Sequence, residues 1–262
     1  MRVLLVSAAD SGGGAFIAAR RLHLALLKSG IDSHILLAKS SKSLPNSAGA
    51  TSNTGHTRAD LRNYSLLPLH WLNKAKTNSL RSFNILPSGL EQKINDLSPD
   101  IVNLHWVNRE MMSIAEIGKI TAPIVWTLHD MWPLLASEHY QGLDQIGEPR
   151  GLLDLDPWMY RRKKRHWSRK KITFVGPSQW MARQPGRSKN FSHMPSFNIS
   201  NPIDLELYQP LSRSFSKKVL GLDTKKRYIL YGSMSGTSDR RKGFRYLSEA
   251  LAQFSPSTID DV

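Results

Sequence analysis

Residues 124–140 read IVWTLHDMWPLLASEHY, and they contain the clearest strand of the chain. The segment from Ile124 to Leu128 is apolar, is rich in β-branched and aromatic residues and follows a proline, which is typical of a buried strand. His129 and Asp130 therefore lie where this strand ends. Ligands of open parallel sheets bind outside the carboxyl ends of the strands, so the pair is a candidate for a site. The alternative of equal weight is that His129 caps local backbone and Asp130 begins a turn.

A second strand with a similar ending lies before this one in the sequence. We expect a strand at Asp100–Leu104, followed by His105 and Trp106, and a connecting helix at residues 111–120. Two consecutive strands thus both end on histidine. This repetition favours at least one histidine lining a pocket over two inert core residues.

The chain begins with a strand, a glycine loop and a helix. Arg2–Ser7 consists mostly of Val and Leu, as in a central parallel strand, and residues 15–30 show helical spacing of apolar side chains. Gly13 and Gly14 lie between them, where glycine permits positive φ and lets an anion approach the helix N-terminus. The alternative is a tight turn of small residues, because the run does not match G-x-G-x-x-G. A strand at His34–Ala38 would complete a right-handed βαβ unit.

The remaining pattern is that of an α/β protein with two domains. The change of composition near residues 209–217 predicts an N-terminal domain at 1–210 and a second domain that begins at 218 and runs to 262. Residues 39–56 are predicted to form a polar loop without regular structure. Further elements are expected as helices at Arg58–Leu80 (broken at Pro68), Leu90–Leu97 and around Trp180, and as strands at Ile172–Val175 and Phe197–Ser200.

The second domain is expected to start with a strand at Arg227–Tyr231, a Gly/Ser loop and an amphipathic helix. Phe244, Leu247 and Leu251 would form the buried face of that helix. Because one strand and one helix cannot close a core, we expect either a truncated chain or one completed by another polypeptide.

The chain is strongly basic, with 36 Lys and Arg against 21 Asp and Glu and a net charge of +15. Such an excess implies an anionic partner or surface. The basic run Arg161–Lys171, interleaved with aromatic residues, fits attachment to an anionic membrane or binding to RNA, and a solvated helix face is the simplest alternative. No run approaches the roughly 18 apolar residues of a membrane span, so we expect a cytoplasmic protein, either soluble or peripheral at the inner face of the membrane.

The absence of cysteine limits the chemistry. It excludes disulfides, thiolate catalysis and Cys-based zinc or iron–sulfur sites. It permits a reducing compartment without proving one.

Six segments stand in an order and spacing that can be compared with a known family: DSGGGAFIAARRLHLALLKSGIDS, IVNLHW, IVWTLHDMWPLLASEHY, FVGPSQWMA, NPIDLELYQP and DRRKGFRYLSEAL. Together they resemble the retaining glycosyltransferases of family 4, and within that family the branch of colanic acid and exopolysaccharide biosynthesis. The resemblance covers nearly the whole chain. It implies the GT-B type of α/β fold, with a Rossmann-like parallel sheet covered by helices on both faces and the beginning of a second Rossmann-like domain.

The resemblance also implies an activity. A hexosyltransferase of this type transfers a sugar from a nucleotide-diphosphate sugar to a saccharide or lipid-linked acceptor with retention, and it needs no metal or other cofactor. The N-terminal domain would bind the acceptor and the C-terminal domain the nucleotide sugar. No nucleic acid partner is expected.

Residue roles follow from the matching positions. His129 matches a histidine that contacts the donor sugar, and Lys242 matches a lysine that neutralises the diphosphate leaving group, as fixed positive charge would. The remaining assignments are Gly13, Gly14, Arg240, Arg241 and Lys242 for the donor and its phosphates, and His105, Trp106 and Asp130 for the acceptor side.

Two departures from the family pattern keep alternatives open. Ser233 stands where relatives often have a basic residue, and the E-x7-E region that holds the donor sugar and ribose is absent from this sequence. The alternatives are an inactive remnant that binds a saccharide or a membrane, and a basic nucleic-acid-binding protein.

Overall fold

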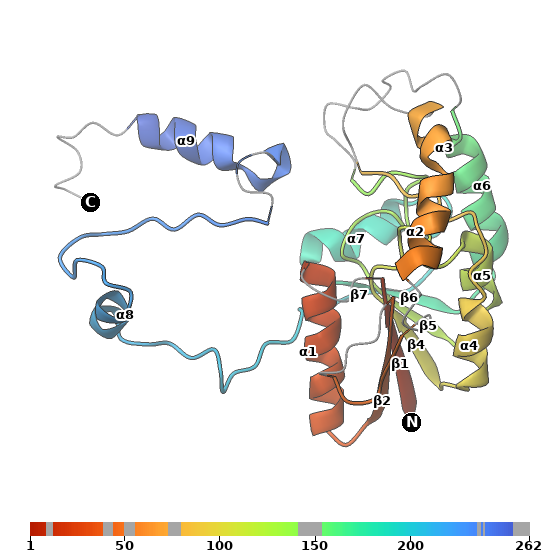
Figure 1. The fold of residues 1–262 in the computed structure, drawn as a ribbon, viewed down its shortest axis with the longest axis horizontal. Helices are drawn as coiled ribbons and strands as arrows, with labels where there is room; N and C mark the ends of the chain where they lie inside the picture. Colours follow the sequence, from red (N-terminus) through yellow and green to blue (C-terminus); the bar gives the residue numbers. More distant parts are fainter. Residues whose placement is uncertain are drawn as a thin grey trace. The chain divides into compact units, whose positions relative to one another are not determined.

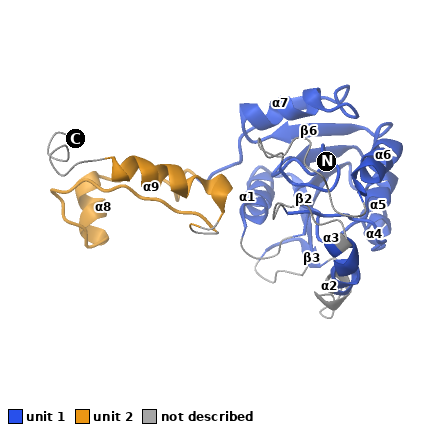
Figure 2. Cartoon of the chain, turned by 90° about the horizontal axis from the view of Figure 1, so that it is seen from above, with its two compact units in different colours: residues 1–204 blue, residues 205–262 orange. Residues whose placement is uncertain are grey.

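The computed structural model describes residues 1–8, 13–38, 44–49, 56–72, 80–140, 154–234, 237 and 239–253. The chain forms two compact units, Met1–Asp204 and Leu205–Val262, which are coloured separately in Figure 2. The second unit begins shortly before the boundary that the sequence predicts at residues 209–217.

The first unit is built on a parallel sheet of seven strands in the order β3-β2-β1-β4-β5-β6-β7. Its strands are β1 (Arg2–Ser7), β2 (Asp32–Leu37), β3 (Ser47–Gly49), β4 (Ile101–Leu104), β5 (Ile124–Thr127), β6 (Ile172–Gly176) and β7 (Ser196–Asn198). Six of these strands were predicted to within a few residues. The prediction of a polar loop at 39–56 was wrong for β3, because this short edge strand has no apolar alternation to reveal it.

Helices cover both faces of the sheet, as predicted. In Figure 1, α1 (Gly14–Lys28) lies on one face, and α4 (Leu90–Asp96), α5 (Ile114–Lys119) and α6 (Asp156–Trp167) lie on the other. The other helices of this unit are α2 (His56–Ser65), α3 (Leu67–Leu72) and α7 (Gln179–Arg187), and α7 lies against β6 and β7. Among the described residues, no helix combines the length and the apolar character that crossing a membrane would require.

Strand periodicity divides the core into two clusters. Val3 and Leu5 of β1 pack with Phe16 and Ala19 of α1, whereas Leu4 and Val6 face the larger cluster on the opposite side. This alternation is what a pleated strand covered on both faces produces. The predicted buried strands of the first unit are therefore confirmed as its core.

Three tryptophans form the centre of the larger cluster. Trp126, Trp132 and Trp167 are at most 1% exposed. The ring centroid of Trp126 lies 6.2 Å from that of Trp132 and 5.1 Å from that of Trp167. Packing among buried aromatic rings fixes the segment after β5 against α6.

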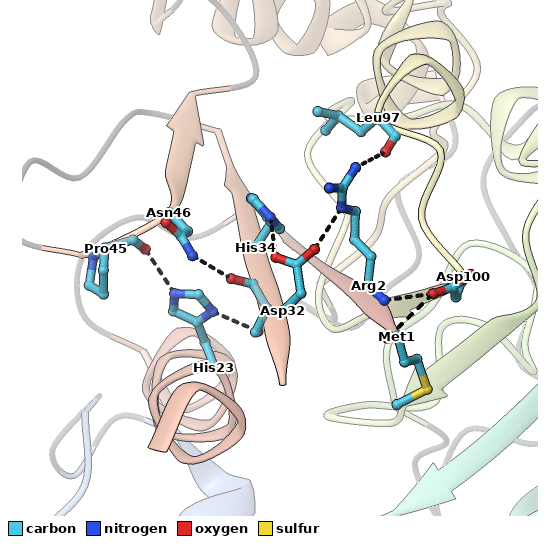
Figure 3. A network of polar contacts seen from close by, with 10 residues as sticks. Met1, Arg2, His23, Asp32, His34, Pro45, Asn46, Leu97 and Asp100 are labelled. Carbon is cyan, nitrogen blue, oxygen red and sulfur yellow. Dashed lines mark hydrogen bonds and ion pairs between the residues drawn. The ribbon is translucent and has the colours of Figure 1, made fainter. Parts of the chain in front are cut away.

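A polar network ties β1, β2 and α1 to the segment before β3 (Figure 3). The Arg2 guanidinium Nε donates to Asp32 at 2.9 Å. The ring of His23 is fully buried, with Nδ1 2.8 Å from Ser33 Oγ and Nε2 2.9 Å from the carbonyl oxygen of Pro45. A carbonyl oxygen only accepts, so the proton of this ring is on Nε2. Burial lowers the pKa of His23.

The second unit contains α8 (Arg213–Val219), the short 3-10 helix η1 (Arg240–Lys242) and α9 (Phe244–Ala252). None of its described residues is buried. The predicted strand at Arg227–Tyr231 is wrong, since these residues pair with no other strand in the described part of the chain. The predicted buried face of α9 is also wrong, because Leu251 is 44% exposed and Phe244 and Leu247 are only half-buried. A single segment cannot satisfy its backbone as a strand without a neighbour.

Candidate functional site

The two predicted histidines meet at the carboxyl edge of the sheet. β4 and β5 are adjacent and parallel, with Leu104 opposite Trp126, so the residues that follow each strand emerge side by side. His105 Nδ1 lies 2.8 Å from His129 Nε2, and the two rings stack with their centroids 5.1 Å apart. His105 is buried, whereas His129 is half-buried. His129 is therefore the member of the pair that a ligand can reach.

Burial favours the neutral form of both histidines. Burial lowers the pKa of His129 to about 4, although the negative charge of Asp130 acts in the opposite direction. Burial, followed by the neighbouring His129, holds the pKa of His105 well below its ordinary value. The pair can therefore offer hydrogen bonds to a ligand, but not a positive charge.

Further polar side chains lie beneath this pair in the sheet. The side-chain amide of Asn103 donates to the carbonyl oxygen of Val125 at 3.0 Å and to Thr127 Oγ1 at 3.2 Å. Three buried polar atoms at this edge have no hydrogen-bond partner among the described residues, namely Ser7 Oγ, Asn103 Oδ1 and His105 Nε2. Unpaired buried polar atoms are costly and uncommon, and these three lie where ligands bind in such folds.

Asp130 and Trp106 form a second set of contacts at the same edge. The Asp130 carboxylate accepts from Trp106 Nε1 at 2.8 Å through Oδ2 and from the backbone N–H of Trp132 at 3.0 Å through Oδ1. Asp130 Oδ2 also lies 2.5 Å from His139 Nδ1. Because Asp130 is 4% exposed, its carboxylate supports the loop after β5 from inside. Its assignment to the acceptor side remains a prediction.

Ser82 and His139 belong to this network and were missed in the sequence. Ser82 Oγ lies 2.8 Å from His139 Nε2, which completes a chain of Asp, His and Ser side chains. In hydrolases this order activates a nucleophile, but His139 is fully buried and Ser82 is 4% exposed, so no substrate reaches the hydroxyl. His139 could have been found in the stretch 124–140, whereas nothing near Ser82 marks it.

Lys163 does not belong to the exposed basic stretch in which the sequence placed it. It is fully buried on α6, and its Nζ donates to the carbonyl oxygens of Trp132 and of Leu135, the latter at 2.9 Å. The Nζ atom also lies 3.7 Å from the ring centroid of Trp132. Burial lowers the pKa of Lys163 well below its ordinary value, against the opposing effect of Asp130. The spacing of Met159, Lys163 and Trp167 on one helix face was the signal for this burial.

The predicted glycines begin α1 at the same edge of the sheet. Gly13 is the residue before the helix and has φ 76° and ψ 142°, a conformation that is open essentially to glycine alone. A Cβ atom on Gly13 or Gly14 would meet no other atom within 4 Å. Since β1 lies beside β4, the N-terminus of α1 and the two histidines share one edge, and a helix N-terminus attracts anions.

The predicted phosphate-binding cations lie in the second unit. Arg240, Arg241 and Lys242 form η1, directly before α9. The Arg241 guanidinium pairs with Asp239, with Nη2 2.7 Å from Oδ2, and lowers the pKa of that carboxyl group. The side chains of Arg240 and Lys242 are exposed. The structure thus groups these three cations with one another, in a different compact unit from His129.

No cluster of three or more His, Asp or Glu side chains suited to a metal ion occurs in the part of the chain that the structure describes. The carboxylate oxygens of Asp130, the residue after His129, already accept hydrogen bonds from protein groups. The polar groups of this edge are therefore arranged for hydrogen bonding.

Comparisons with known proteins identify the fold. No protein-family model matches the sequence. No curated protein matches it either. Similar solved structures include Anabaena Alr3699/HepE in complex with UDP, with 14% sequence identity, a TM-score of 0.51 and an alignment of 98% of this chain with 58% of the HepE chain. The HepE complex with UDP-glucose gives 14% identity, a TM-score of 0.49 and the same coverage.

A third structure, HepE in complex with UDP and glucose, has 14% identity and a TM-score of 0.45, with 84% of this chain aligned to 50% of that one. The present chain therefore spans 50 to 58% of the HepE chains that it matches. At this identity the likeness to the UDP complex concerns the fold alone. It confirms the predicted α/β class, a Rossmann-like parallel sheet with helices on both faces.

Proposed function

We propose that this chain is part of a glycosyltransferase of the GT-B type that uses a nucleotide-diphosphate sugar. The observation that carries the proposal is the hydrogen-bonded pair of His105 and His129 at the carboxyl edge of the sheet, beside the glycine start of α1. The fold similarity to the HepE structure that contains UDP supports the choice of ligand class. The finer proposal is a retaining hexosyltransferase of family 4 that acts in polysaccharide biosynthesis.

The chemistry of the two units suits this reaction. A half-buried neutral histidine recognises sugar oxygens through hydrogen bonds without attracting counterions. The departing nucleotide diphosphate carries negative charge, which Lys242 and Arg240 are suited to stabilise. Fixed cations and helix N-termini then replace a metal ion, so we propose that transfer needs no metal or other cofactor.

Isothermal titration with UDP-glucose and GDP-sugars tests the proposal. We expect binding to the unaltered chain and weaker binding in His129→Ala and in Lys242→Ala. Matched controls are His193→Ala and Lys218→Ala, which remove an exposed histidine and an exposed lysine elsewhere. Binding of no nucleotide sugar would leave the first alternative, an inactive remnant on the acceptor side.

The acceptor is proposed to be a saccharide or a lipid-linked saccharide at the inner face of the membrane. Arg161, Lys164 and Arg165 are exposed on α6 and could face anionic lipid, where each basic residue contributes about 1 kcal/mol. Trp158, 40% exposed on the same helix, lies with its ring 5.1 Å from the guanidinium carbon of Arg162. This surface keeps the basic character predicted for Arg161–Lys171, apart from the buried Lys163.

Sedimentation with vesicles of phosphatidylserine and phosphatidylcholine tests whether this basic surface of α6 binds anionic lipid. Binding should require the anionic lipid and should weaken in the double variant Arg161→Glu, Lys164→Glu, but not in Lys218→Glu. The second alternative, a nucleic-acid-binding protein, requires salt-sensitive binding to RNA that the same double variant abolishes. We expect no such binding.

A further inference from the structure

His105 and His129 form one hydrogen bond that leaves different atoms available on the two rings. His129 Nε2 is occupied by His105 Nδ1 at 2.8 Å. His129 Nδ1 makes no hydrogen bond among the described residues, and the side chain is half-buried rather than sealed. A ligand at this edge therefore meets the Nδ1 side of the ring.

Only two arrangements of protons are compatible with two neutral rings. If His129 donates, His105 Nε2 must carry a proton, and this N–H would be a buried donor without a partner. If His105 donates, its Nε2 is instead an unpaired acceptor, and His129 carries its proton on Nδ1. Orphaned buried N–H groups are rarer in proteins than under-satisfied acceptors, so the second arrangement is favoured.

We propose that His105 is a positioning residue that fixes His129 in the tautomer with its proton on Nδ1, so that His129 presents a neutral N–H donor to an oxygen of the bound sugar nucleotide. This inference rests on the proposed function and adds the direction of the hydrogen bond to it. A ligand oxygen at His129 then accepts, as a sugar hydroxyl or a phosphate oxygen can. His105 itself, 3% exposed, does not touch the ligand.

Two substitutions of His105 distinguish the effect of losing its hydrogen bond to His129 from the effect of losing the volume of its ring. In His105→Asn, the side-chain amide nitrogen can occupy nearly the position of Nδ1 and can still donate to His129 Nε2. In His105→Leu, an apolar side chain of similar bulk removes the donor. His193→Asn is the control for the loss of a histidine that lies on the surface.

Nitrogen NMR of the ¹⁵N-labelled full chain at pH 7 reads the tautomer of His129 directly. We expect a protonated Nδ1 and an unprotonated Nε2 in the unaltered chain, in His105→Asn and in His193→Asn, with a shift of the proton towards Nε2 in His105→Leu. A proton on Nε2 of His129 in the unaltered chain overturns the proposal. The spectrum of the unaltered chain decides this point even if His105→Leu does not fold.

Titration with UDP-glucose supplies a second readout. Loss of one well-placed hydrogen bond predicts binding that is about tenfold weaker in His105→Leu, and the donor retained in His105→Asn should restore most of the affinity. Equal weakening in both variants would overturn the positioning role. If His129 has the Nδ1 proton but no nucleotide sugar binds, the proposed function fails while the positioning role stands. If a nucleotide sugar binds but His129 carries its proton on Nε2, the proposed function stands and the positioning role fails.

Discussion

α1 and α9 both follow a glycine, but the two helices lie in different environments. Each follows a glycine with positive φ, Gly13 at 76° and Gly243 at 74°, and each carries an apolar stripe. α1 buries Phe16 and Ala19 against β1 and β2, whereas α9 buries no residue. An apolar stripe therefore predicts burial only where a sheet is available to receive it, because most helix stability comes from tertiary packing.

This difference extends to the two units. The first unit has a core of side chains that are almost entirely inaccessible, while Leu230 of the second unit is 96% exposed. Hydrophobic burial is the main favourable term in folding. The stability of the chain should therefore reside in the first unit, and the following predictions test that conclusion.

The largest effect is expected from the tryptophan cluster. Trp126→Ala removes a ring that packs against Trp132, Trp167 and Phe174, and it should lower the free energy of unfolding by about 4 kcal/mol. Leu230→Ala removes an exposed side chain and should change it by less than about 0.5 kcal/mol. Urea denaturation followed by tryptophan fluorescence measures both. Comparable losses would show that the second unit also stabilises a core.

A smaller effect is expected from two neighbouring lysines on α6. Lys163→Ala leaves the carbonyl oxygens of Trp132 and Leu135 without their donor and opens a cavity, so we expect a loss of about 3 kcal/mol. Lys164→Ala, at the adjacent exposed position, should cost less than about 0.5 kcal/mol. The same denaturation experiment checks the pair, and equal effects would contradict the burial of Lys163.

Histidine titration should affect the first unit alone, because all nine histidines lie before residue 205. The pKa values of His23, His70, His105, His129 and His166 are lowered in the folded protein, so the unfolded chain binds more protons below pH 6.5. The free energy of unfolding should therefore fall as the pH drops from 6.5 towards 4, and His129 alone should contribute about 2 kcal/mol of this fall after allowing for solvent screening at its half-buried ring.

Denaturation at a series of pH values measures this slope. His129→Gln should flatten this slope, because the variant removes one of the five histidines whose pKa values are lowered. A slope that stays the same in His129→Gln would show that burial does not lower the pKa of this histidine.

The sequence predicted most of the sheet because central parallel strands are continuous apolar runs. Ile124–Thr127 and Arg2–Ser7 both show this pattern and both form strands. Ser47–Gly49 was missed because a short edge strand needs little apolar surface. Arg227–Tyr231 shows the opposite failure, since a strand-like pattern forms no strand without a neighbour.

The site was predictable only where the order of strands along the chain determines which side chains come together. His105 and His129 were found because they follow adjacent strands, and their contact follows from the parallel register. The burial of Lys163 and the bond between Ser82 and His139 depend on packing between segments distant in sequence. Residue type alone predicts the wrong environment for Lys163 and Ser82, because a lysine is ordinarily solvated and a serine is common in loops.

The smallest effect concerns the two glycines that precede α1 and α9. Gly13→Ala places a side chain in a backbone region that disfavours it and should cost the first unit about 1 kcal/mol of unfolding free energy. Gly243→Ala imposes a similar local strain at φ 74° and ψ 11°, yet α9 has no buried residue, so this strain should reduce the helicity of α9 without shifting the global transition. Circular dichroism measures the helicity and urea denaturation the transition. If Gly243→Ala lowered the global stability as much as Gly13→Ala, α9 would have to be packed against a core as α1 is, and the contrast between the two helices would disappear.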